Sequence, residues 1–67
     1  MNWDQIKGNW KQLTGKVKEK WGKLTDDDLT VAAGHRDQLL GVLQQRYGIH
    51  KEKAEKDLDE FVRALRD

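Results

Sequence analysis

The sequence predicts an all-α protein, a small bundle of about four helices. Three observations favour this fold class: apolar residues recur every three or four positions near the N-terminus, a central segment has a wide apolar face, and the last segment is amphipathic. No stretch alternates apolar and polar residues with a period of two over a useful length. We therefore expect no β-strand.

The first predicted helix lies in the stretch of residues 3–24, which contains all three tryptophans. Its apolar residues follow one another at intervals of 3, 4, 3, 4, 4 and 3 positions, which places them within an arc of roughly 80° on a helix. They are Trp3, Ile6, Trp10, Leu13, Val17, Trp21 and Leu24. Asn2 precedes them as a helix cap. We expect this face, and the three indole rings above all, to lie in the core.

Three glycines, Gly8, Gly15 and Gly22, are spaced by sevens along the same segment. On a helix they lie nearly opposite the tryptophans, and Gly22 is expected to end the helix. Each of the other two costs about 1 kcal/mol relative to alanine, so our first expectation is a bend or break near Gly8 or Gly15. The alternatives are that the glycine face meets another backbone, or that marginal local order is itself useful.

The second predicted helix begins at a capping box formed by Thr25 and Asp28, with Asp26 and Asp27 beside it in the first turn. Three adjacent carboxylates also raise the question of Mg²⁺ or Ca²⁺ binding. However, the alternating ligands, the central glycine and the final glutamate of an EF-hand loop are missing. We therefore predict no metal site, and we expect Gly34 to separate this short helix from the next.

Residues 35–47 form the third predicted helix, with apolar residues at Leu39, Leu40, Val42, Leu43 and Tyr47. These side chains cover an arc of roughly 140°, so the helix is expected to pack centrally, against more than one neighbour. Gly48 is a C-terminal stop. Gly41, in the middle of the helix, is expected to allow close packing against the first helix.

The last predicted helix covers residues 51–66, although His50 is a poor cap residue. Its apolar face consists of Ala54, Leu58, Phe61, Val62 and Leu65. We expect the core to combine the apolar face of the first helix with side chains of the two later helices, namely Leu39, Leu43, Leu58, Phe61 and Leu65.

At 67 residues, the chain is expected to form one domain, residues 1–67, with a stability on the order of a few kcal/mol. Cysteine is absent, which fits a reducing cytoplasm and excludes disulfide-rich secreted scaffolds. No apolar run approaches the roughly 18 residues of a transmembrane helix, and the N-terminus lacks the apolar run of a signal peptide. We expect a cytoplasmic monomer without a transmembrane segment.

The charges are unevenly distributed along the chain. Residues 1–23 carry six lysines against two acidic residues, a net charge of +4, whereas the remainder carries seven basic and ten acidic residues, a net charge of −3. This asymmetry could steer an acidic partner toward the N-terminal half. We favour the simpler interpretation that oppositely charged helices attract each other, because exposed charges are normal on solvated helices.

Catalytic chemistry finds little support in the residue types. The chain has no cysteine and no serine, and its threonines and Tyr47 lie in no recognised motif. His35 and His50 are the only imidazoles, and their spacing matches no metal-binding pattern. So small a chain also leaves little room for a pocket of a few hundred Å³. We predict no enzyme activity and no cofactor.

An anionic partner is the strongest alternative to a purely structural interpretation. The candidate contacts are the six N-terminal lysines, Lys7, Lys11, Lys16, Lys18, Lys20 and Lys23. Lysines interleaved with tryptophans could give phosphate contacts and base stacking on a nucleic acid, or hold an amphipathic helix at an anionic lipid surface. Against both, the tryptophans form the apolar face of their helix, which the rest of the chain is expected to cover.

Several segments match a known pattern. GNWKQLTGKVKEKWGKLTDDD, the later GHRDQLLG and the C-terminal QQRYGIHKEKAEKDLDEF together resemble the CsbD-like family of small bacterial stress-response proteins, closest to its YjbJ-type branch. His50 stands where relatives commonly have a serine cap. The resemblance implies about four helices, arranged as two helical hairpins packed across each other, in a cytoplasmic protein made during general stress. It implies no reaction, ligand or catalytic residue.

The leading functional hypothesis is therefore a small non-enzymatic stress-response protein, whose hydrophilic composition and glycine content also resemble the protective hydrophilins. The second hypothesis is a binding module whose basic first helix contacts nucleic acid or an anionic membrane surface. A third is self-association through the glycine face.

Overall fold

The computed structural model describes residues 2–65. Five helices follow one another: α1 (Trp3–Gly8), α2 (Trp10–Lys20), α3 (Asp26–Ala32), α4 (Arg36–Tyr47) and α5 (Lys51–Ala64). The predicted all-α class is confirmed, and no strand occurs in the described part of the chain. Five helices replace the expected four because the first predicted helix is divided in two. The predicted last helix ran to residue 66, which lies outside the described residues.

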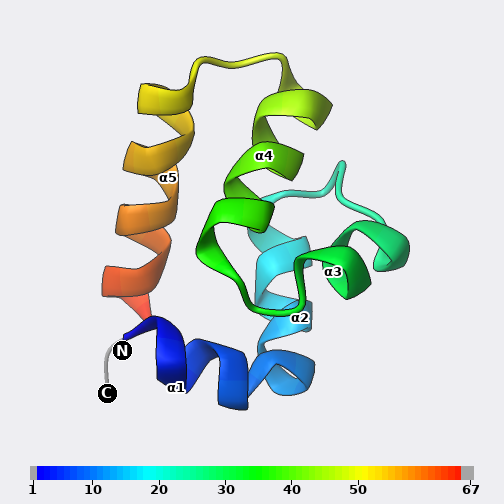
Figure 1. The fold of residues 1–67 in the computed structure, drawn as a ribbon, viewed down its shortest axis with the longest axis vertical. Coiled ribbons are helices and arrows are strands. Elements are labelled where there is room, and N and C mark those ends of the chain that lie inside the picture. Colours follow the sequence, from blue (N-terminus) through cyan, green and yellow to red (C-terminus); the bar gives the residue numbers. More distant parts are fainter. Residues whose placement is uncertain (1, 66–67) are drawn as a thin grey trace.

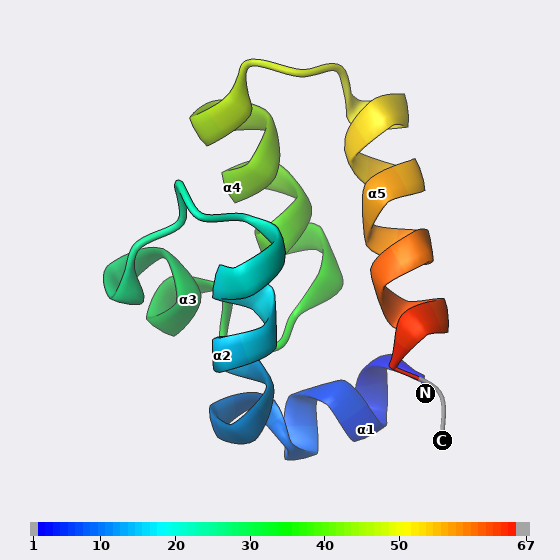
Figure 2. The same cartoon turned by 180° about the vertical axis from the view of Figure 1, so that it is seen from behind.

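Asn9 divides the first predicted helix. Its backbone N–H still donates to the carbonyls of Gln5 and Ile6, and its side-chain amide donates to Gln5 O at 3.0 Å. Its own carbonyl accepts from Gln12 and Leu13 and so starts α2. One residue therefore ends α1 and begins α2, and the two axes diverge sharply (Figure 2). The break expected near Gly8 is confirmed, whereas the helix continues through Gly15.

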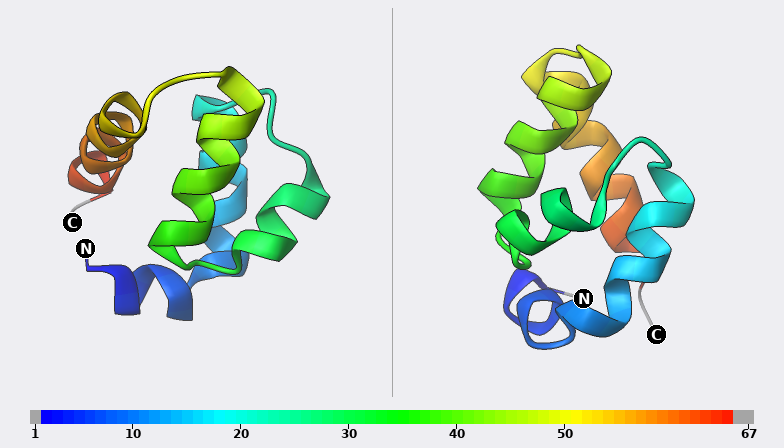
Figure 3. Two further views of the ribbon diagram at one scale, coloured as in Figure 1. Left: turned by 45° about the horizontal axis from the view of Figure 1, so that its top comes forward. Right: turned by 90° about the vertical axis from the view of Figure 1, so that its right-hand side faces the viewer.

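Helix α4 occupies the centre of the molecule, between α3 and α5 (Figure 1). It contacts both neighbours, as its wide apolar arc predicted. Helices α4 and α5 form an antiparallel hairpin, and α1 lies across the opposite end of the bundle (Figures 1 and 3). The Cα radius of gyration is 10.8 Å, which matches the roughly 11 Å of a compact chain of this length.

The core is made by α2 to α5 and by the loop between α2 and α3. Its buried members are Val17, Trp21, Leu24, Leu29, Ala32, Leu39, Leu40, Leu43, Ala54, Leu58 and Phe61. Trp21, directly after α2, packs on Phe61 of α5, with ring centroids 5.1 Å apart and planes tilted by 56°, a favourable aromatic geometry. Trp3, Trp10 and Leu65 are only half-buried and pack against this cluster, while Ile6 and Leu13 are buried.

The turn between α3 and α4 has two consecutive left-handed residues, Ala33 with φ 50° and Gly34 with φ 82°. Gly34 is buried against α1, and a Cβ at this position would lie 2.7 Å from the Cα of Lys7. Only glycine fits such a close backbone approach with a positive φ. Gly34 therefore separates the two helices as predicted and also brings α1 against the α3–α4 turn.

Two expectations about other glycines are wrong. Gly22 is not a left-handed cap: α2 ends at Lys20, and the capping residue is Trp21, with φ −123°. Gly41 does not allow close packing against the first helix, because it is exposed and a Cβ there would meet open space. By contrast, Gly48 ends α4 in the left-handed conformation as expected.

Candidate functional site

The six candidate lysines all lie on α1, α2 and the loop that follows, and all are exposed. They do not converge on one point. On the α2 helical wheel Lys11 and Lys18 lie on one side of the apolar face, and Lys16 and Lys20 lie on the other. Lys7 belongs to α1, whose axis is turned away from that of α2 (Figure 2). The fold thus spreads the six charges over a broad surface.

Few of these charges are neutralised inside the molecule. Within residues 2–65, Lys18 is the only one of the six that forms a salt bridge, with Asp26 at the start of α3. Lys20 lies over the Trp21 ring, 5.5 Å from its centroid, and Lys23 lies over the Tyr47 ring at 5.3 Å. The predicted attraction between oppositely charged helices therefore involves only one of the six lysines, Lys18, within residues 2–65.

Within residues 2–65, Asp28 accepts more hydrogen bonds than any other carboxylate, and the sequence predicted only its local capping role. The Asp28 carboxylate, 8% exposed, accepts hydrogen bonds from Arg46 Nε at 2.9 Å and Arg46 Nη2 at 2.8 Å. It also accepts the backbone N–H of Thr25 at 3.1 Å, which completes the predicted capping box. The Arg46 hydrogen bonds and the Thr25 N–H lower the pKa of Asp28 to about 2.

Tyr47, beside Arg46, holds the loop before α3. Its hydroxyl oxygen accepts a hydrogen bond from the backbone N–H of Lys23 at 3.1 Å. Arg46 and Tyr47 together therefore fasten residues 23–28 to the end of α4. The capping box is readable in the sequence, but its partner Arg46 lies 18 positions further on, and no local pattern indicates such a pairing.

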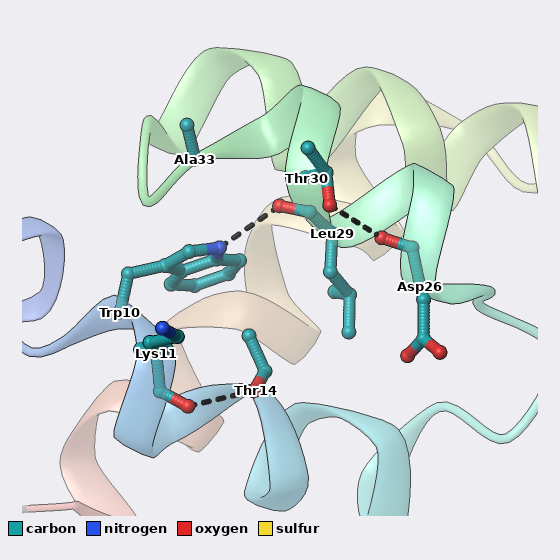
Figure 4. A pocket seen from close by; sticks show the side chains of 7 residues that line it. All are labelled: Trp10, Lys11, Thr14, Asp26, Leu29, Thr30 and Ala33. Carbon is teal, nitrogen blue, oxygen red and sulfur yellow. Dashed lines mark hydrogen bonds between the residues drawn. The ribbon is translucent and has the colours of Figure 1, made fainter.

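A hollow of about 390 Å³ opens between α2 and α3 (Figure 4). It is lined mainly by Trp10, Lys11 and Thr14 of α2 and by Asp26, Leu29 and Thr30 of α3. The Trp10 indole Nε1–H donates to the Leu29 carbonyl at 2.8 Å. The expectation that the chain has little room for such a space is wrong, because α3 folds back beside α2 and leaves a gap between the two helices.

The fold adds no candidate metal site among residues 2–65, and it places the two histidines at helix starts. Within residues 2–65, no three His, Cys, Asp or Glu side chains are grouped in a way that could hold a metal ion. His35 and His50 instead occupy the capping positions of α4 and α5, and neither makes a side-chain capping hydrogen bond. Every helix in the described part of the chain is too short or too polar to span a bilayer.

Comparison with known proteins places these features in context. The family model described as CsbD-like matches residues 4–56. The chain is 67% identical over 58 residues to a UPF0337 protein of Pectobacterium atrosepticum, covering 87% of this chain and 84% of the relative. It is 62% identical over 58 residues to UPF0337 protein YjbJ of Escherichia coli K12, with coverages of 87% and 84%. A UPF0337 protein of Protochlamydia amoebophila is 61% identical over 61 residues, with coverages of 91% and 92%.

Proposed function

The chain belongs to the CsbD-like family, and from this premise we propose that it is a small non-enzymatic general stress-response protein. It acts in the cytoplasm by hydrophilin-like protection, in which a very polar, abundant protein keeps other macromolecules apart during water loss. Its mean hydropathy of −0.99 and its charged fraction of 37% support this role. So does the absence of cysteine, which fits a reducing compartment.

One observation carries the proposal most directly. Among the described residues, Val31 is the only large apolar side chain that is well exposed, at 64%. Chaperones that hold unfolded clients need larger exposed apolar patches. Protection by this protein would therefore come from charged surface and molecular crowding, and it would require a molar excess over the client.

A drying assay tests this mechanism. A dehydration-sensitive enzyme is dried and rehydrated with increasing amounts of the protein, and its recovered activity is compared with that in equal masses of serum albumin. We expect recovery to exceed that with albumin and to rise gradually with molar excess. Recovery no better than with albumin would remove the protective role, and saturation at a one-to-one ratio would indicate client binding instead.

The second candidate function is contact of the basic α1–α2 surface with nucleic acid or anionic lipid. The observation that favours it is that, within residues 2–65, five of the six candidate lysines form no salt bridge. Such binding would be non-specific and would weaken steeply with salt. Titration of DNA, RNA and anionic vesicles across salt concentrations tests it, and affinities that stay millimolar even at low salt would exclude it.

A further inference from the structure

The Trp10 ring borders the hollow between α2 and α3 (Figure 4). Trp10 is half-buried, and its indole N–H is fully used by the Leu29 carbonyl. The Leu29 side chain, 2% exposed, is anchored in the core cluster. The ring therefore cannot swing freely over the gap, and the hollow keeps its shape. Because Leu29 is covered by the core, the half-buried indole ring of Trp10 is the apolar surface that remains accessible in the hollow, and it offers stacking and dispersion contacts to a planar apolar group.

The hydroxyl groups around the hollow are engaged within their own helices. Thr14 Oγ1 donates to the Lys11 carbonyl at 2.8 Å, and Thr30 Oγ1 donates to the Asp26 carbonyl at 2.9 Å. Neither hydroxyl hydrogen is directed to a ligand in this arrangement. The side-chain donor that remains for a ligand on the walls of the hollow is the ammonium group of Lys11.

The charges around the hollow are unequal. Asp26 supplies a carboxylate, but Lys18 is bound to it across the gap between α2 and α3. Lys11 lies at the Trp10 end of the hollow (Figure 4) and forms no salt bridge with any carboxylate of residues 2–65. The lining itself carries one lysine and one carboxylate, and Lys18 from outside the lining pairs with that carboxylate, so Lys11 is left as the unpaired charge beside the Trp10 ring.

We propose that this hollow binds a small aromatic carboxylate, with its ring against the Trp10 indole and its carboxylate beside Lys11. The volume of about 390 Å³ lies in the lower part of the range of roughly 300–1,000 Å³ for small-molecule sites. The site is open to solvent and has one charged anchor, so the affinity is low, with a Kd on the order of 1 mM. It is independent of the protective role proposed above.

The test uses 1-naphthoate as the probe and the full chain in two-dimensional ¹H–¹⁵N NMR at low ionic strength. We expect the indole N–H of Trp10 and the amides of Thr14 and Thr30 to shift together and to saturate. Lys11→Gln should raise the Kd about threefold, the effect of one exposed ion pair. The matched control Lys16→Gln removes an equal charge from the same helix outside the hollow and should leave the Kd unchanged.

Two further comparisons make the outcome decisive. The probe 1-naphthylmethylamine has the same ring and the opposite charge, and it should bind more weakly than naphthoate. Thr30→Phe places a ring in the hollow from an exposed position and should remove the Trp10 shift. The proposal is overturned if both lysine variants weaken binding equally, if the cationic probe binds as well as naphthoate, or if the shifts scatter over the whole lysine surface.

Discussion

Arg46, in the last turn of α4, donates two hydrogen bonds to the carboxylate of Asp28, in the first turn of α3. Each partner also faces a favourable helix end, because the carboxylate lies at the N-terminus of α3 and the guanidinium lies at the C-terminus of α4. Bidentate pairs of this kind are geometrically specific as well as strong. This contact, together with the core packing of Leu29 and Ala32, holds α3 on α4.

Asp28→Asn should lower the thermal midpoint more than Asp27→Asn. Both substitutions remove a negative charge from the first turn of α3, but of the two only Asp28 accepts hydrogen bonds from Arg46, whereas Asp27 is exposed. Thermal unfolding by circular dichroism measures the difference. Combining Asp28→Asn with Arg46→Gln should cost less than the sum of the single effects, because both remove the same interaction. Equal midpoints for the two asparagine variants would contradict this account.

The same pair predicts a specific loss of stability in acid. The pKa of Asp28 is lowered from 3.8 to about 2 in the folded protein, so the unfolded chain binds the proton more readily. The stabilisation is complete above about pH 4 and is lost as the pH falls toward 2. Urea unfolding midpoints of the wild type and of Asp28→Asn should therefore differ at pH 6 and converge near pH 2. A constant difference across this range would argue against the lowered pKa.

Gly34→Ala should be strongly destabilising. The substitution puts a side chain on a residue with φ 82° and brings its Cβ to 2.7 Å from the Cα of Lys7. Left-handed strain and overpacking together cost about 2–4 kcal/mol, a large part of the stability of so small a chain. Gly22→Ala is the control, because its φ is not positive and a Cβ there meets open space. Similar unfolding midpoints for both variants would show that the close approach to α1 is unimportant.

Gly15→Ala should stabilise the protein. Gly15 lies inside α2, is exposed, and leaves open space where a Cβ would be. Alanine is favoured there by about 1 kcal/mol, which corresponds to a rise of about 4–8 °C in the thermal midpoint of a domain of this size. Gly48→Ala, also in open space but with φ 61°, should lower the midpoint. A fall with Gly15→Ala would mean that the helix is not continuous at this position.

The three tryptophans should differ in fluorescence. Trp21 is 5% exposed, so a variant with phenylalanine at positions 3 and 10 should emit at short wavelength and resist quenching by acrylamide. A variant that retains only Trp10 should emit at longer wavelength and be quenched more readily, because this ring is half-buried beside the open hollow. Water-exposed emission from Trp21 would instead favour the membrane or nucleic-acid function, since the apolar face would then be uncovered.

Local features of the fold were largely readable from the residues. The Thr25–Asp28 capping box, the end of α4 at Gly48 and the break after Gly8 follow from side chains and backbone preferences a few positions apart. The errors concern Gly22 and Gly41. A glycine after a helix permits a left-handed cap but does not require one, as Gly22 shows. For Gly41, whether another backbone approaches depends on residues far away in the sequence.

The candidate site likewise combines features that are readable in the sequence with features that only the fold reveals. The lysines are visible in the sequence, yet only the fold separates Lys18, paired with Asp26, from Lys11, which lies beside Trp10 at the hollow. No local pattern in the sequence indicates that Leu29 and Thr30 border this hollow, because their position there depends on α3 folding back beside α2.

The sequence by itself determined the helical class, the family, most helix ends and the polar character of the surface, because these depend on composition, apolar period and capping between neighbouring residues. Only the tertiary structure decided that Asp28 binds Arg46, that Gly34 packs against Lys7 and that Trp10 borders an open hollow. Each of these brings together residues that lie far apart in the sequence, and such contacts depend on how the helices and turns pack in three dimensions.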